Sequence, residues 1–315
     1  FAQYSLDLNK LNVSLGARFD HYKITDEQSE SAGKSGNVLS PQIKIKYDIR
    51  KYFQARVSYS QGYRAPQIFD EDLHIETSGS RQVIHENDPG LKQETSHSYM
   101  ASTDFNKQVG RLYIGVLAEA FYTRLNDAFV NIYGTPDENG VVVYTRTNAD
   151  GGAVVKGLNL ETNLSTGEGV SLKSGFTIQR SRYDEAQEFN HTKFFRTPDC
   201  YGYLTLDLKL FHDLGISPAA NYTGKMLIPY FGNRLASPET GELHQSDPFL
   251  DLGLKIRYDI HLKGAVLQVF GGMKNIFNAY QDDFDRGIDR DPGYVYGPGL
   301  PRTVYFGIKI GNMLN

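Results

Sequence analysis

The chain has 315 residues, 40% of them hydrophobic and 22% charged, which is enough for one large domain or two ordinary ones. Its net charge of −4 gives no basic surface that would argue for nucleic acid or anionic lipid. A mean hydropathy of −0.44, with no apolar run near the roughly 18 residues of a membrane helix, excludes a helical membrane protein.

Alternation of apolar and polar residues predicts about 13 β-strands. In the clearest of them, Leu250 to Ile260, the apolar residues occupy one face, while Lys255 and Arg257 lie on the other. Long strands that are apolar on one face and ionic on the other favour a wall between lipid and water. The approximate spans are 1–8, 11–24, 37–49, 52–63, 94–107, 110–133, 141–166, 169–184, 196–211, 214–230, 247–262, 265–280 and 301–312.

The connections between these strands alternate between tight turns and long polar loops. Short turns follow residues 8, 49, 107, 166, 211 and 262, and the longest loop covers residues 64–93. Outer-membrane barrels have short periplasmic turns and longer extracellular loops, so the last strand is predicted to end on the periplasmic side. With 13 strands the first and last run the same way and cannot close a sheet, so residues 1–315 are predicted to be a single domain that is part of a larger barrel.

Four motifs occur in order at strand ends, the first of them in two parts. Tyr59–Pro66 is followed by Asn87–Ser96, then by Gly157–Glu161 in its strand, and Lys274–Asn278 precedes Tyr296–Thr303. Together they resemble the TonB-dependent outer-membrane receptors, whose strands carry Gly-Phe/Tyr-Arg-Ala-Pro, Asn-Pro-x-Leu-Lys-Pro-Glu, Gly-hydrophobic-Glu and Lys-Asn-Leu-Phe sequences. Each motif alone is weak, but their order over nearly the whole chain identifies the family.

The resemblance implies a fold and a set of partners. The fold is an all-β, antiparallel transmembrane β-barrel of 22 strands, of which this chain would form about the 13 C-terminal ones, without the N-terminal plug and the first strands. The implied partners are the inner-membrane TonB complex acting through the plug, the plug itself and outer-membrane lipid; a surface lipoprotein is left open. The implied location is the bacterial outer membrane.

The same resemblance implies import of a scarce, bulky solute. A ferric siderophore or another iron chelate is the commonest substrate class of the family, and cobalamin or an oligosaccharide is the alternative. No catalytic motif and no cofactor motif occurs, so no enzyme activity and no cofactor are expected. A soluble, secreted carbohydrate-binding β-protein would also alternate and be rich in Tyr, and a passive porin would share the barrel.

Two groups of residues are candidates for contact with ligand or plug. Aromatic and cationic residues at the bases of the long loops could grip a large ligand, although girdle or loop packing would also explain them; these are Tyr63, Arg64, Tyr230, Phe231, Arg234, Tyr280, Tyr294 and Tyr296. Charges in the middle of strands are predicted to line a hydrated lumen and face the plug; these are Arg18, Lys44, Arg56, Glu119, Glu161, Lys173, Asp207, Lys255 and Arg257.

Two other clusters could suggest a metal. Residues 282–291 contain an Asp-x-Asp-x-Gly segment whose carboxylates could hold calcium, but the remaining EF-hand positions are missing and two arginines compete. Glu71, His74, His85 and Glu86 lack zinc-ligand spacing. Solvated loops are therefore expected at both places, and no metal site is predicted.

Overall fold

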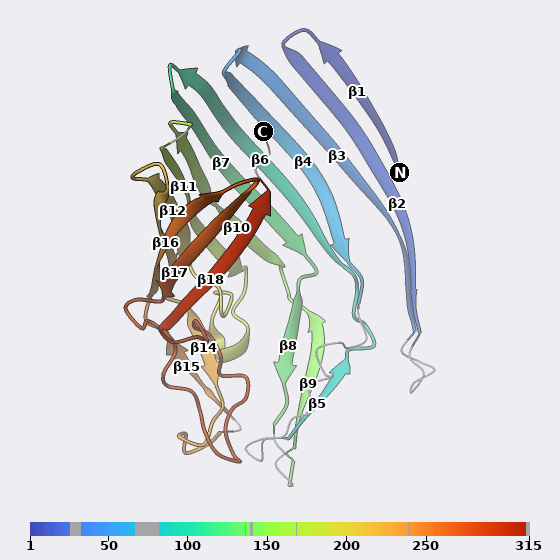
Figure 1. Ribbon diagram of the computed structural model, residues 1–315. Helices are drawn as coiled ribbons and strands as arrows, with labels where there is room; N and C mark the ends of the chain where they lie inside the picture. The colour runs from blue at the N-terminus through green and yellow to red at the C-terminus, as the bar shows by residue number, and fades with distance from the viewer. Residues whose placement is uncertain are drawn as a thin grey trace.

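The structure, a computed structural model, describes residues 1–25, 33–66, 82–135, 137–138, 141–167, 169–238 and 240–312 (Figure 1). One antiparallel sheet of 13 strands dominates it, which confirms the predicted all-β, antiparallel architecture. In sheet order the strands are β1 Ala2–Leu8, β2 Leu11–Ile24, β3 Lys34–Arg50, β4 Phe53–Arg64, β6 Glu94–Val109, β7 Leu112–Asn126, β10 Ala153–Ser165, β11 Val170–Tyr183, β12 Cys200–Lys209, β13 Leu214–Thr223, β16 Phe249–Leu262, β17 Ala265–Lys274 and β18 Thr303–Asn312.

Three predicted strands are wrong in extent because each of them breaks in two. The span 110–133 divides into β7 and β8 Phe129–Tyr133 at Asp127, which has a φ of 51°. The span 141–166 divides into β9 Val141–Asn148 and β10 at Gly151 and Gly152, with φ of 70° and 83°. A positive φ cannot continue an extended ladder, so the chain leaves the sheet at these points. The span 214–230 likewise divides into β13 and β14 Leu227–Tyr230.

The strand segments released by these breaks form two small sheets beyond the large one. β9 pairs antiparallel with β8 and parallel with β5 Gln82–Asn87, a strand inside the predicted loop 64–93. β14 pairs with β15 Glu242–Gln245. The helical structure of the described residues is the short 3₁₀ turn η2 Glu188–Asn190, and no helix among them has the length and apolar character needed to cross a membrane.

The turns and loops segregate to opposite ends of the large sheet, as predicted. The tight turns between β1 and β2, β3 and β4, and β6 and β7 lie at the upper end in Figure 1, while the small sheets lie at the lower end. By the direction assigned from loop length, the lower end is the extracellular one.

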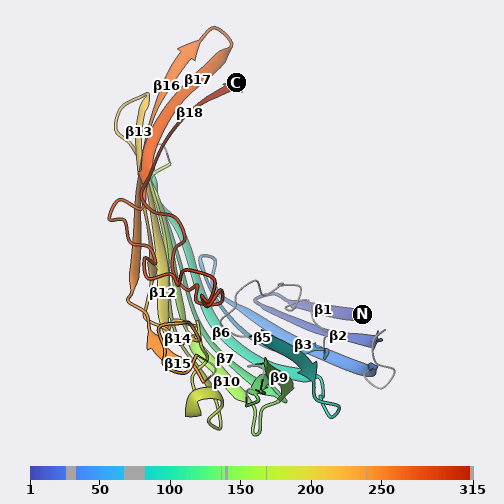
Figure 2. The ribbon, with the colours of Figure 1, turned by 90° about the horizontal axis from the view of Figure 1, so that it is seen from below.

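The two faces of the large sheet differ in character. On β18 alternate residues Val304, Phe306, Ile308 and Ile310 are 71%, 90%, 65% and 72% exposed. Figure 2 shows the sheet as one curved layer without a second sheet packed on it. The apolar faces therefore do not press together around a dry interior, which is the arrangement that a soluble β-sandwich requires.

The two buried clusters of the described residues lie at the loop end of the large sheet. One cluster contains Met226, Ile228, Tyr230 and Tyr294, and a smaller one contains Ala128, Ala149 and Ala153. At the edges of the sheet, β1 pairs with β2 alone and β18 pairs with β17 alone. Among the described residues the sheet is therefore open.

Candidate functional site

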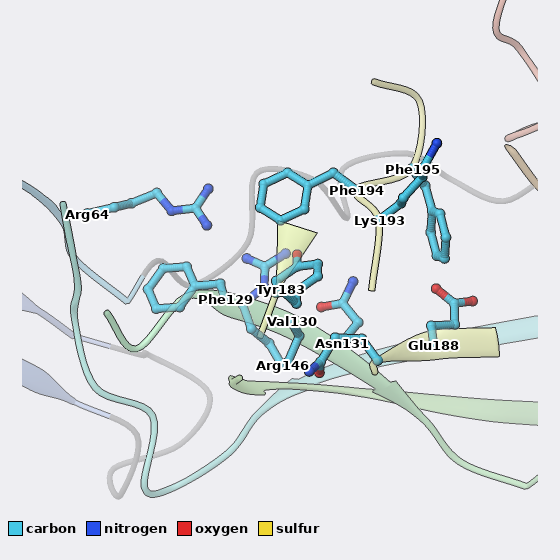
Figure 3. A pocket seen from close by; sticks show the side chains of 11 residues that line it. Arg64, Phe129, Val130, Asn131, Arg146, Tyr183, Glu188, Lys193, Phe194 and Phe195 are labelled. Atoms are coloured by element: carbon cyan, nitrogen blue, oxygen red, sulfur yellow. The ribbon is translucent and has the colours of Figure 1, made fainter. Parts of the chain in front are cut away.

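A pocket of about 320 Å³ opens at the extracellular end of the sheet (Figure 3). Arg64 enters it from the end of β4, Tyr183 from the end of β11, and Glu188 from η2. The remaining walls come from β8, β9 and the segments on either side of η2, and they are Phe129, Val130, Asn131, Arg146, Gln187, Lys193, Phe194 and Phe195. Three cations and one carboxylate line this space, so the side chains give it a cationic character.

Glu94 holds one wall of the pocket together. Its carboxylate lies 3.5 Å from the Arg64 guanidinium and accepts a hydrogen bond of 3.0 Å from the Phe129 backbone N–H. The Arg64 guanidinium in turn lies 4.5 Å from the centre of the Phe129 ring. β8 is therefore fixed against β4 and β6 through one carboxylate, and the cation is presented on an aromatic surface.

The opposite wall is aromatic. The rings of Tyr183 and Phe194 are 4.5 Å apart, and Lys193 forms an ion pair of 2.8 Å with Asp199. Arg182 and Lys193 form a β-bridge that brings the segment after η2 back to β11.

A second pocket of about 520 Å³ adjoins the first through shared walls at Asn131, Gln187 and Glu188. Phe189 and Phe231 line it, with ring centres 5.8 Å apart, and Phe189 also lies 5.9 Å from Phe195. We call the two pockets together the mouth cleft. A cation over a ring and half-buried phenyl groups suit a bulky anionic ligand with planar groups.

The predicted ligand residues divide into three sets. Arg64 and Phe231 line the mouth cleft, whereas Tyr63 stacks on Tyr22 at 6.0 Å and Tyr280 is half-buried in the loop after β17. The other four meet in a separate group, which we call the tyrosine cluster; they are Tyr230, Arg234, Tyr294 and Tyr296.

The tyrosine cluster is organised around the carboxylate of Asp283. Tyr294 and Tyr296 donate hydrogen bonds of 3.0 and 2.8 Å to its two oxygens, and the Tyr294 hydroxyl also lies 3.1 Å from Nδ1 of His244. Burial is the main cause that raises the pKa of Tyr294 to about 12, and the hydrogen bond to Asp283 is the second cause. The same two causes raise the pKa of Tyr296. Tyr230 is fully buried, so this group ties loops together.

Carboxylates of the acidic segment 282–291 also hold the loops around the tyrosine cluster together. Asp285 accepts the Asp291 backbone N–H at 2.8 Å and lies 3.5 Å from Arg234, while Asp291 accepts the Phe231 N–H at 2.8 Å. Across the described ranges, no three His, Cys, Asp or Glu side chains gather as metal ligands. Glu71 and His74 lie outside the described residues, as does the side chain of His85; Glu86 accepts a bond of 2.7 Å from Thr145.

Several of the mid-strand charges pair along the polar face. Arg56 lies 3.1 Å from Asp104, Arg257 lies 3.1 Å from Asp207, and Arg18 lies 2.6 Å from Asp20. Glu119 accepts a bond of 3.0 Å from Asn159, and the Lys255 ammonium lies 4.5 Å from the Phe270 ring centre. Lys44, Glu161 and Lys173 share this face by strand register.

Sequence reasoning missed most of the cleft walls. Phe129 and Arg146 fell within predicted long strands, and Lys193 and Phe195 fell within the predicted loop 185–195. The aromatic run Phe194-Phe195 between polar residues was the one local signal available for them.

Comparison with known proteins places this arrangement among receptor barrels. A sequence profile described as "TonB dependent receptor-like, beta-barrel" matches residues 1–276. A comparison with curated protein sequences finds no match.

Similar solved structures include one transporter and two receptors. The FrpB iron transporter from Neisseria meningitidis is 16% identical with a TM-score of 0.66 over 97% of this chain and 44% of its own. The ferripyoverdine receptor of the outer membrane of Pseudomonas aeruginosa is 16% identical with a TM-score of 0.64, covering 97% and 37%. The ferric-catecholate import receptor Fiu from E. coli K12 is 16% identical with a TM-score of 0.66, covering 96% and 42%.

At this identity the similarity shows the fold, and the chain spans less than half the length of these receptors. The profile match over residues 1–276 covers most of the 315 residues. An antiparallel sheet with tight turns at one end and long loops at the other is the arrangement expected of such a barrel. The chain therefore belongs to the TonB-dependent receptor-like β-barrel family, whose members are receptors and transporters of the bacterial outer membrane rather than enzymes.

Proposed function

We propose that this chain is the ligand-gripping part of an outer-membrane receptor that imports an iron chelate, with a ferric siderophore as the substrate. The mouth cleft carries the proposal, because it joins Arg64, Arg146 and Lys193 to several aromatic rings at the extracellular end. Siderophore chelates are bulky, often anionic and often aromatic. Rings and fixed guanidinium groups bind such a ligand through stacking and charge.

The similar solved structures support this substrate class. Their titles name an iron transporter, a ferripyoverdine receptor and a ferric-catecholate import receptor. We assign ligand contact to Arg64, Arg146, Lys193 and Phe231, and loop positioning to Tyr230 and Tyr294. Residues 1–315 act as one domain in this proposal.

Transport would use parts of the receptor beyond this chain. The charged face with Arg56, Asp207 and Arg257 would line the lumen and contact a plug domain. The inner-membrane TonB complex would supply the energy by acting on that plug. No covalent chemistry is needed for this function.

Ligand capture by the full receptor tests the proposal. Detergent-purified receptor is incubated with bacterial culture supernatant, and the ligand that co-purifies is identified by metal analysis and mass spectrometry. Iron with a chelator supports the proposal, whereas cobalt points to cobalamin, and a metal-free sugar points to oligosaccharide uptake; either of these contradicts it.

The role of the cleft is tested by mutation. Arg64→Ala with Lys193→Ala removes two cations, and we expect the affinity for an anionic ferric chelate to fall by about tenfold or more, as charged hydrogen bonds are worth about 1.5–3 kcal/mol. Lys225→Ala is the matched control, since Lys225 is an exposed cation at the same end of the sheet and outside the cleft. Equal affinity of the double variant and the wild type would refute the assignment.

A further inference from the structure

Two cations stand directly opposite each other on the apolar face of the sheet. Lys156 on β10 pairs in register with Arg180 on β11. Both side chains are exposed, and neither forms an ion pair or hydrogen bond with another described residue. Like charges at directly opposed positions of an antiparallel pair repel each other, so this arrangement favours an anion between them.

Their row coincides with an aromatic belt. Strand register continues from Lys156 to Tyr122, Tyr99 and Tyr59. Ring centres are 6.4 Å apart for Tyr99 and Tyr122 and 5.1 Å apart for Tyr59 and Tyr99. Tyrosines gathered on the outer face of a barrel mark the level of the membrane interface.

Strand length places this belt at the extracellular interface. Lys156 lies near the extracellular end of β10, which continues to Ser165 at the other end. Nine residues at about 3.4 Å each, on a strand tilted by about 40°, span about 23 Å, close to the roughly 25 Å of a barrel's apolar band. Lys156 and Arg180 therefore lie at head-group level in the outer leaflet.

An apolar hollow of about 610 Å³ begins one pair of residues below the two cations. Leu158 and Ile178, the next residues on the same face, form its upper wall, and Leu160 and Phe176 continue it. The hollow forms because the neighbouring strands carry small side chains here, namely Ala55, Ala101, Ala118 and Ala120. On a surface that faces hydrocarbon, such a hollow fits a single acyl chain.

We propose that Lys156 and Arg180 bind the phosphate of an acylated lipid with a phosphorylated head group in the outer leaflet, and that one of its acyl chains fills the hollow. Guanidinium and ammonium groups bind phosphate strongly. The two cations lie at head-group level, and the apolar hollow lies beside them at the level of the acyl chains. The net charge of −4 for the whole chain gives no sign of this site, because only two cations form it.

Native mass spectrometry of the full receptor in detergent tests the proposal, with lipid A, dephosphorylated lipid A and inorganic phosphate as separate probes. We expect one lipid A per receptor, with affinity about 10- to 100-fold above that of the dephosphorylated form, as charged phosphate contacts predict. Inorganic phosphate alone should bind weakly, because it lacks the acyl chain. Equal binding of lipid A and its dephosphorylated form would overturn the proposal.

Variants separate the two halves of the site. Lys156→Gln with Arg180→Gln should lower lipid A affinity by a similar factor, and Ala120→Phe should lower it by filling the hollow, while Lys156→Arg should retain it. Lys107→Gln is the control, because Lys107 lies on the same face near the periplasmic turn. Each variant is compared after its folded, SDS-resistant band is confirmed. Unchanged affinity in the charge-removed variant, or an equal loss in the control, would overturn the proposal.

Discussion

A single carboxylate, Asp283, determines the packing of two tyrosines at the extracellular end. Tyr294 is almost fully buried, and its hydroxyl contacts both Asp283 and His244. Gln281, also buried, accepts the Tyr296 backbone N–H at 2.8 Å and donates to the Tyr294 carbonyl at 2.9 Å. Polar groups in this cluster are thus satisfied internally, which keeps a long loop in one conformation.

Tyr294→Phe should loosen this loop. The change leaves an oxygen of Asp283 without its donor and removes the hydroxyl oxygen that lies 3.1 Å from Nδ1 of His244, at a cost of about 1–3 kcal/mol. Limited proteolysis of the folded receptor should then show faster cleavage within residues 281–300. Tyr280→Phe is the control, since its hydroxyl bonds to no other described residue; equal cleavage rates for the two variants would contradict the expectation.

The same cluster should lose stability at high pH. The pKa of Tyr294 in the folded protein is raised to about 12, compared with about 10 in an unfolded chain. The Tyr294 hydroxyl therefore holds its proton more tightly in the folded protein. Its stabilising contribution is complete below pH 10 and declines as the pH rises through 12. Tyrosinate absorbance and protease resistance, followed together from pH 8 to 12.5, check this; loop opening below pH 9 would contradict it.

Each strand of the large sheet is an element with two environments. On β16, Ile256 and Tyr258 are 46% and 50% exposed on the apolar face, whereas Arg257 between them bonds to Asp207 and Ser217 at 3.1 Å. Alternation fixes which residues meet hydrocarbon, because a strand cannot slip by one residue without exchanging its faces. Charge on the apolar face is therefore costly, while charge on the polar face is not.

Ile256→Arg tests this at the middle of β16. A cation at the bilayer midplane of a barrel costs about 2–4 kcal/mol, so the receptor refolded into lipid vesicles should unfold at lower denaturant concentration. Ile256→Ala is the matched control, because it removes the side chain without adding charge and should cost much less. Similar unfolding midpoints for the two variants would mean that this face does not contact hydrocarbon.

At the scale of the whole molecule the sheet has two free edges. β1 and β18 each have one strand neighbour among the described residues. A free edge presents unpaired backbone N–H and C=O groups, which are unfavourable in lipid and invite pairing with another chain. The curvature of the layer in Figure 2 is that of part of a larger wall.

Residues 1–315 produced alone in detergent micelles should therefore associate through these edges. Light scattering should give a mass well above one chain, and no SDS-resistant monomer band should form. The full receptor, with its remaining strands, should be monomeric under the same conditions. A monodisperse, SDS-resistant monomer of residues 1–315 would show that the edges can be satisfied within the chain.

The sequence by itself determined the sheet: the number of long strands, which residues face each side, and which end carries the long loops. These follow from a period of two and from turn length, which are local properties. Only the tertiary structure decided the mouth cleft and the tyrosine cluster. Phe129, Arg146 and Lys193 meet because β8 and β9 leave the large sheet at Asp127 and Gly152, and because distant loops pair with each other. Such contacts depend on chain segments far apart in sequence, and no local periodicity specifies them.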